Sequence, residues 1–194
     1  MSGHILPYRG MAPRIAEDAF IAETAAIIGD VEIGAGASIW YACVVRGDVN
    51  RIRIGRNTNL QDGTVIHCNG DRAGDYRTTG GGEPTHIGDD VVVGHMALLH
   101  ACTVGDGAFI GMRAVVLDRA VVEPGAMVAA GAVVTPGKVV KSGQLWGGMP
   151  ARYMRELSEQ DLAEGPYIVG HYRDLAGDYL ERLRGARPAA RAGC

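Results

Sequence analysis

The sequence has few aromatic residues and no excess of either charge. Aromatic side chains make up 6% of the 194 residues although 47% are apolar, so the core has to be filled by small and branched side chains. Lysine and arginine number 19 against 22 aspartates and glutamates, a net charge of −3. That balance gives no reason to expect binding to nucleic acid or to an anionic membrane.

Cysteine is also scarce, and long hydrophobic runs are absent. The four cysteines match neither a disulfide framework nor a paired zinc knuckle, which fits a reducing compartment. The N-terminal stretch MSGHILPYRGMAPRIAEDAF lacks the unbroken apolar run of a secretory signal, and no segment has the length of a membrane span. We therefore expect a soluble cytoplasmic protein.

What the sequence does contain is a repeat of six residues with abundant glycine. Branched apolar residues recur at this spacing, with gaps before Ile54 and Ile87 and one five-residue step from Leu99 to Val104. The set is Ile33, Ile39, Val45, Ile54, Leu60, Ile66, Ile87, Val93, Leu99, Val104, Ile110, Val116, Val122, Val128, Val134, Val140 and Trp146. A small residue usually follows four places later, at Ala37, Cys43, Thr58, Thr64, Ala97, Thr103, Ala108, Ala114, Ala120, Ala126 and Ala132. Glycine is common one place later, as at Gly94 and Gly111.

A period of six fits neither an amphipathic helix nor an alternating strand. It fits a short strand and a tight turn repeated many times, with glycine where the turn requires it. Three such strands make one triangular coil, and coils stack at the sheet spacing of about 4.8 Å. The sequence resembles the hexapeptide-repeat superfamily over roughly residues 15–150. That resemblance implies a left-handed parallel β-helix and a trimer.

Three histidines stand out on this predicted solenoid. His67 and His100 each follow the apolar residue of one column, so they lie at the same place on adjacent coils, close enough to reach one ion. His95 lies two places after Val93, on another face, beside Asp62. In a threefold trimer, His95 of the partner subunit can approach the pair. Three imidazoles with an open fourth position are typical of catalytic zinc, although each histidine can also be a lone polar residue on a coil surface.

Three stretches resemble the gamma-class carbonic anhydrases and their close relatives. They are VVRGD at 44–48, NLQDGTVIH at 59–67 and VGHMALLHACTVGD at 93–106. The resemblance implies a zinc site between subunits, with Fe²⁺ or Co²⁺ as other possible metals, in which two ligands come from one chain and one from the next. The implied ligands are His67, His95 and His100.

Four further residues match this family. The resemblance implies that Arg46 and Asp48 form an ion pair across the trimer interface; the alternative is a solvated turn whose ion pair contributes little. Gln61 is placed to hydrogen-bond the nucleophilic hydroxide. Asp62 is placed to orient a ligand or to pair with an arginine of the neighbouring chain.

The implied reaction is the hydration of carbon dioxide to bicarbonate. Zinc lowers the pKa of its water to about 7, so that hydroxide is available at neutral pH. Two departures leave the proton-export residue unassigned. Val49 stands where one branch of the family has a glutamate, and that branch carries its proton-shuttle glutamate in an acidic loop. Here the corresponding loop is glycine-rich, and its acidic residues have no clear placement: Asp71, Asp75 and Glu83.

We expect two parts in the chain. Residues 1–152 form the β-helix domain, with an N-terminal lead-in and a loop excursion at 68–86, and residues 153–194 form a C-terminal helical segment that packs on it. Ser158 caps a short helix that Gly165 and Pro166 end. A second helix follows, with an apolar stripe at Ile168, Tyr172, Leu175, Tyr179 and Leu183. Tyr172 either approaches the metal pocket, as the family resemblance implies, or serves only this packing face.

Two other functions remain open. One is a hexapeptide acyltransferase, although these enzymes need no metal triad. The other is a metal-binding trimer with a thioesterase, accessory or scaffold role and little anhydrase activity. Metal content and carbon dioxide hydration distinguish the three.

Overall fold

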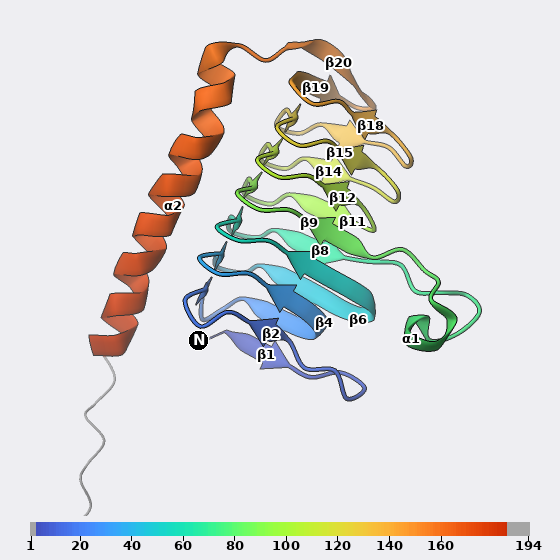
Figure 1. The fold of residues 1–194 in the computed structure, drawn as a ribbon, viewed down its shortest axis with the longest axis vertical. Helices are drawn as coiled ribbons and strands as arrows, with labels where there is room; N and C mark the ends of the chain where they lie inside the picture. Colours follow the sequence, from blue (N-terminus) through green and yellow to red (C-terminus); the bar gives the residue numbers. More distant parts are fainter. Residues whose placement is uncertain (1–2, 186–194) are drawn as a thin grey trace, which may run out of the picture.

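The chain winds into a parallel β-solenoid with three faces and a C-terminal helix, which confirms the predicted solenoid class (Figure 1). The computed structural model describes residues 3–185. The first face contains β1 (His4–Leu6), the starts of β4 (Ala26–Ile33) and β6 (Val44–Ile54), β8 (Val65–His67), β11 (Leu98–His100), β14 (Val115–Val116) and β17 (Val133–Val134). The second contains β2 (Arg14–Ile15), the ends of β4 and β6, β9 (Thr85–Ile87), β12 (Thr103–Val104), β15 (Val121–Val122) and β18 (Val139–Val140). The third contains β3 (Phe20–Ile21), β5 (Ser38–Ile39), β7 (Asn59–Leu60), β10 (Val92–Val93), β13 (Phe109–Ile110), β16 (Met127–Val128), β19 (Gln144–Gly148) and the antiparallel β20 (Ala151–Glu156).

The apolar residues of the six-residue repeat fill the interior of the solenoid. Every one of them from Ile33 to Val140 is at most 3% exposed, and only Trp146 at the end of the series is partly exposed. The small positions are buried as predicted, with one exception: Thr103 is exposed and Cys102 takes the inward place. The reason is the five-residue step, which moves the small inward position one residue closer to Leu99.

Glycines one place after the apolar residue serve close stacking of the coils rather than turn geometry. Gly94 and Gly111 are not among the glycines with positive φ, so the expectation that the turn requires them is wrong. A Cβ on Gly94 would instead lie 2.6 Å from the backbone nitrogen of Met112 in the next coil. Only glycine lets the coils approach this closely.

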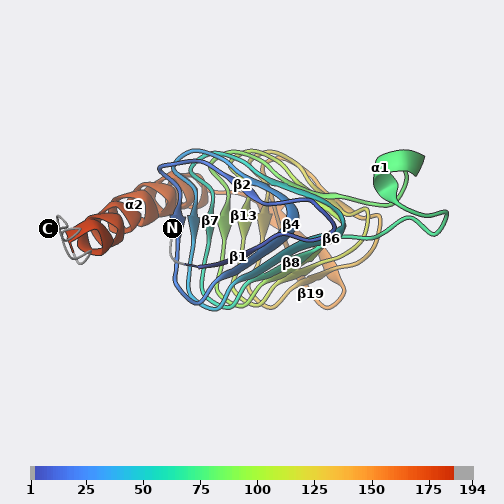
Figure 2. The same cartoon turned by 90° about the horizontal axis from the view of Figure 1, so that it is seen from below.

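One helix, α2 (Glu159–Gly185), runs along the third face (Figures 1 and 2). The predicted break at Gly165 and Pro166 is wrong, because the helix continues through the proline. Pro166 leaves the carbonyl of Leu162 without its helical partner, but Leu162 is on the exposed side, where water can satisfy that carbonyl. Val169 and Ala176 are buried against the solenoid and hold the helix in place.

An aromatic cluster joins this helix to the third face. Trp40 packs against Phe20, Tyr172 and Tyr179 with ring centroids 4.9, 5.2 and 5.4 Å away. Aromatic pairs at such separations add to the apolar area that they bury. The cluster fixes Tyr172, from the predicted helical stripe, near the third face of the solenoid.

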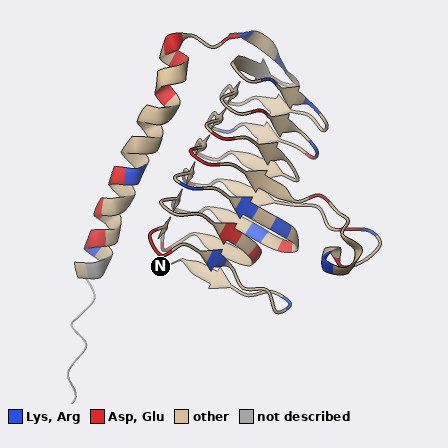
Figure 3. Cartoon of the chain, in the orientation of Figure 1, with Lys and Arg blue, Asp and Glu red and all other residues tan. Residues whose placement is uncertain are grey.

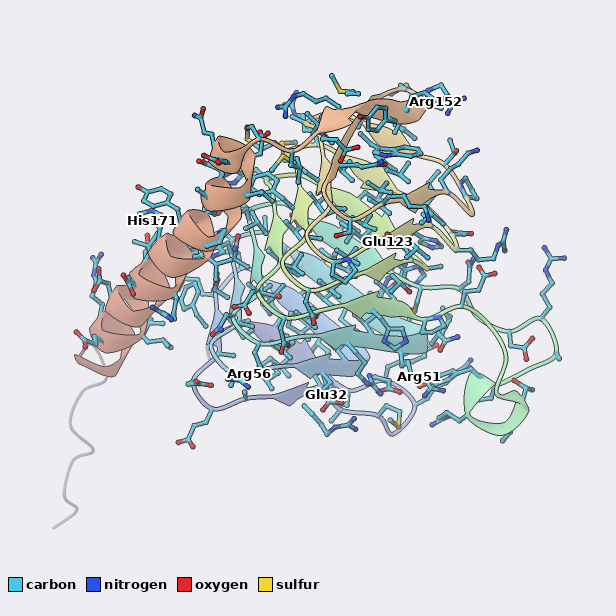
Figure 4. The ribbon with its side chains drawn as sticks, turned by 45° about the horizontal axis from the view of Figure 1, so that its top comes forward. Glu32, Arg51, Arg56, Glu123, Arg152 and His171 are labelled. Atoms are coloured by element: carbon cyan, nitrogen blue, oxygen red, sulfur yellow. The ribbon has the colours of Figure 1, made fainter. Side chains whose placement is uncertain are left out.

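The chain leaves the solenoid after β8, forms the short helix α1 (Tyr76–Thr79) and returns at β9. This excursion projects from the side opposite α2 (Figure 2). The Tyr76 hydroxyl donates a hydrogen bond of 2.6 Å to Asp30, a buried carboxylate that also pairs with Arg53 at 2.9 Å. Arg51 lies over the Tyr76 ring on the same side (Figure 4). The excursion is therefore anchored to the body.

Charged residues of both signs adjoin one another on β4 and β6 (Figure 3). Glu32 pairs with Arg14 at 2.9 Å and with Arg53 at 3.2 Å, so these charges balance across neighbouring coils. Neither helix within residues 3–185 is long and apolar enough to cross a membrane.

Candidate metal centre

His67 and His100 lie side by side on the first face, as the repeat predicts. They end β8 and β11 and are direct register partners, although 33 residues separate them in sequence. Nδ1 of His67 is 3.2 Å from Nε2 of His100, and both side chains are partly buried. The solenoid thus fixes two imidazole nitrogens at a separation that one ion can bridge.

A carboxylate holds the outer nitrogen of each histidine. Oδ1 of Asp48 is 3.1 Å from Nε2 of His67, and Oδ1 of Asp118 is 2.6 Å from Nδ1 of His100. An ionised carboxylate only accepts hydrogen bonds, so the outer nitrogen of each histidine is the donor in its contact. When both imidazoles are neutral, each of the two facing nitrogens carries a lone pair that is available to a metal ion.

The charges around His67 favour its neutral form. Burial lowers the pKa of His67, and the nearby Arg46 and His100 lower it further, against the raising effect of Asp48. Burial also disfavours the charged form of Asp48, but hydrogen bonds from Arg46 and His67 outweigh it and lower the pKa of Asp48. At neutral pH the site therefore presents an ionised carboxylate and a neutral imidazole, the form in which imidazole binds a metal.

Arg46 and Asp48 pair with each other in the same chain, at 2.7 Å between Nη1 and Oδ2. Because Asp48 also contacts His67, this pair is continuous with the histidines. Its role across a trimer interface stays a prediction.

Asp118 is a residue of this site that the sequence reasoning missed. It follows Val116, the next member of the His67 and His100 column, by two places rather than one. The signal was present in the sequence as an acidic residue one coil beyond His100, in the turn directly after β14. Burial disfavours its charged form, but hydrogen bonds from His100 and Asn69 outweigh this and lower the pKa of Asp118.

His95 lies in the corner after β10, close to Asp62 and Gln61. Its Nδ1 is 3.0 Å from Oδ2 of Asp62, and its backbone N–H donates to Oε1 of Gln61 at 3.2 Å. The predicted proximity of His95 and Asp62 is confirmed. The Tyr172 hydroxyl lies 3.5 Å from Nε2 of His95, so this tyrosine reaches the histidine while its ring packs on Trp40.

Gln61 is buried, and its amide is held on both sides. Its Nε2 donates to Oδ1 of Asn59 at 3.3 Å, while its Oε1 accepts from His95. Asn59 was not singled out from the sequence. Its own Nδ2 is buried and has no hydrogen-bond partner among the residues that the structure describes.

One chain does not bring the three histidines together. Within residues 3–185, no group of three or more histidine, cysteine or acidic residues is arranged to hold a metal ion. His67 and His100 form one half of a candidate site, and His95 with Asp62 and Tyr172 forms another. Completing a three-histidine site requires a second chain.

The other reactive groups near the site have structural partners. Asp75 caps α1 and pairs with Arg77, while Glu83 pairs with Arg119 at 2.5 Å. The thiol of Cys68, next to His67, is buried and contacts the backbone oxygen of Asn50 at 3.2 Å. Burial raises the pKa of the described thiols to about 12: Cys43, Cys68 and Cys102. Cys194 lies outside the described residues.

Comparison with known proteins agrees with this architecture. The family model described as bacterial transferase hexapeptide (six repeats) matches residues 101–136. The carbonic anhydrase of Geobacillus kaustophilus is 43% identical over 183 residues, which is 94% of each protein. The chain belongs to the gamma carbonic anhydrase-like family of hexapeptide-repeat proteins.

Two further relatives define the extent of this similarity. Gamma carbonic anhydrase 2 of Arabidopsis thaliana, described as mitochondrial, is 47% identical over 167 residues, 85% of this chain. The chain spans only 58% of the length of that plant protein. The crystal structure of a hexapeptide transferase family protein from Anaplasma phagocytophilum is 45% identical, with a TM-score of 0.83 over 92% of this chain and 99% of that one. The family thus includes proteins named for two different chemistries.

Proposed function

We propose that this protein hydrates carbon dioxide to bicarbonate in a zinc-dependent reaction, at a site shared between the subunits of a cytoplasmic homotrimer. His67 and His100 of one subunit and His95 of the partner subunit hold the metal. The observation that supports this most directly is the pair of facing nitrogens 3.2 Å apart. Two nitrogens of a tetrahedral zinc site with bonds of 2.0–2.1 Å lie about 3.4 Å apart, so the pair fits the ion closely.

The donor atoms also have the required protonation. Asp48 and Asp118 hold the protons on the outer nitrogens, which leaves one lone pair on each imidazole for the metal. Asp62 does the same for His95 by accepting from Nδ1, so that Nε2, which the Tyr172 hydroxyl approaches at 3.5 Å, is the nitrogen left for the metal. Imidazole suits Fe²⁺ and Co²⁺ as well as Zn²⁺, so these ions are alternatives at the same site.

An exposed apolar stripe beside the histidines supports the trimer. Val65 and Leu98 precede His67 and His100 by two residues, on the same outer face, and each is 37% exposed. Val44 and Val115 extend the stripe in register with them. Burying this stripe against a second chain favours association, since apolar area removed from water contributes about 25 cal/mol per Å².

When bound, zinc supplies Lewis-acid chemistry and lowers the pKa of its water to about 7. The other residues of the site position groups around it. The Tyr172 hydroxyl is a polar group next to the free nitrogen of His95. Gln61, buried and held by Asn59, fixes the backbone at His95, and Asp62 holds the ring of His95 at Nδ1.

The principal alternative is an acyltransferase, because the matching family model and the similar Anaplasma structure both carry transferase names. A metal-binding trimer with a thioesterase, accessory or scaffold role is the other.

The test is the zinc content and carbon dioxide hydration rate of the wild type, His100→Ala and His86→Ala. His86 is an exposed histidine on β9 and serves as the matched control. We expect about one zinc per chain and saturable hydration for the wild type and for His86→Ala, and loss of both for His100→Ala. Zinc without hydration favours the accessory role, and acetyl-CoA turnover without zinc favours the acyltransferase.

A further inference from the structure

We propose that Asp118 is a positioning residue for the metal site, which holds His100 with Nδ1 protonated and Nε2 directed at the ion. The inference rests on the proposed metal site. Asp118 lies outside the three sequence stretches that resemble the carbonic anhydrases, so nothing in those motifs assigns it a role.

The geometry around His100 supports this role. The contact from Oδ1 of Asp118 to Nδ1 of His100, at 2.6 Å, is shorter than the 3.1 Å contact between Asp48 and His67. A short hydrogen bond to a carboxylate fixes both the tautomer and the ring plane, and it makes the other nitrogen a stronger donor to a metal. His100 ends a strand, so the backbone alone leaves its ring free to turn.

Asp118 is itself held from the other side. Nδ2 of Asn69 donates to its second oxygen, Oδ2, at 2.7 Å, and donates also to Glu83 at 3.0 Å. Glu83 is fixed in turn by Arg119. Each carboxylate oxygen of Asp118 therefore has one partner, and the carboxylate has one orientation.

This network connects the two metal ligands through the start of the excursion. Asn69 is two residues after His67, and its side chain reaches Asp118, which contacts His100. A displacement of the loop at residues 68–84 therefore moves the carboxylate that orients His100. The arrangement predicts that Asn69 acts on the metal only through Asp118, with a smaller effect.

A carboxylate at a coil corner can also serve the backbone alone, and Asp89 shows this. Its Oδ1 accepts the backbone N–H of Arg56 at 2.7 Å, in a corner of the solenoid. Asp89→Asn is the matched control, because it changes the same functional group at a corner without touching a histidine.

The experiment measures the zinc dissociation constant of the metal-free protein by competition with a chromophoric chelator. We expect Asp118→Asn to weaken zinc binding about 10- to 100-fold. Asn69→Ala should weaken it less, and Asp89→Asn should match the wild type. The unfolding midpoint of the metal-free protein is measured alongside, and we expect Asp118→Asn to lower it only slightly, because the asparagine oxygen can still accept a hydrogen bond from His100. The spectrum of the cobalt-loaded protein should change for Asp118→Asn, which a purely structural role would not produce.

Zinc binding within about threefold of wild type for Asp118→Asn would overturn the positioning role and leave the proposed function intact. Equal weakening by Asp89→Asn would overturn it too, by showing a general effect of corner carboxylates. If the wild type takes up no zinc, the proposed function fails first, and this inference fails with it.

Discussion

Mixing two inactive variants gives the sharpest test of a site shared between chains. His95→Ala keeps the His67 and His100 pair, and His100→Ala keeps His95. Each variant alone should bind no zinc and hydrate no carbon dioxide. Subunits of the two variants, unfolded together and refolded at equal concentration, should regain both properties, because a complete site forms wherever the intact halves meet.

The size of the recovery follows from which residues share a chain. At each interface of a closed threefold ring, the chain that supplies the histidine pair must be the His95→Ala variant, and its neighbour must be the His100→Ala variant. With random mixing each condition is met half of the time, so about one quarter of the interfaces are complete. Zinc content and the stopped-flow hydration rate should both recover to about 25% of the wild-type value.

The matched control mixes His67→Ala with His100→Ala. Both changes damage the same half of the site, since these residues are neighbours in one chain. No interface of that mixture is complete, and no recovery is expected. Recovery in this control, or none in the first mixture despite trimers containing both variants, would refute the shared site.

Four further outcomes concern the stability of the fold and the accessibility of its thiols. Leu99→Ala, at a fully buried position, should lower the free energy of unfolding by about 2–5 kcal/mol in chemical denaturation. Gly94→Ala should lower it by about 1–3 kcal/mol, because its new Cβ meets the next coil. Gly177→Ala, which meets nothing within 4 Å, should be neutral or slightly stabilising. Thiols with a pKa of about 12 are ionised at only about one part in 10⁴ at pH 8, so these cysteines should react with a thiol reagent only after unfolding: Cys43, Cys68 and Cys102.

The interior of the solenoid was predictable because one rule repeats along it. A large apolar residue and a small partner at fixed spacing define each side of a coil, and the same pattern in neighbouring coils supports the assignment. The rule failed at Thr103, where a shorter step changed the count. The rule also gave the wrong reason for the glycine at position 94. The glycine is needed for contact between neighbouring coils, and the sequence of one coil does not show that contact.

The helix shows a different limit. Gly165 and Pro166 are strong local breakers, yet α2 passes through both, because tertiary packing at Val169, Ala176 and the Trp40 cluster outweighs local propensity. Contacts of this kind join segments more than a hundred residues apart, and the spacing of apolar residues within one segment does not predict them.

The site divides in the same way. Register alone placed His67 beside His100 and Asp62 beside His95, since neighbouring coils stack residue over residue. Asp118 was not predicted because it lies in the turn after β14, out of register with His100, and only its side chain reaches that histidine. A solenoid gives each face its own set of stacked residues, so it can align ligands from distant coils but cannot turn two faces toward one ion. In the proposed three-histidine site, metal binding would therefore be coupled to assembly, because the chain that aligns His67 and His100 would present its own His95 to a different neighbour.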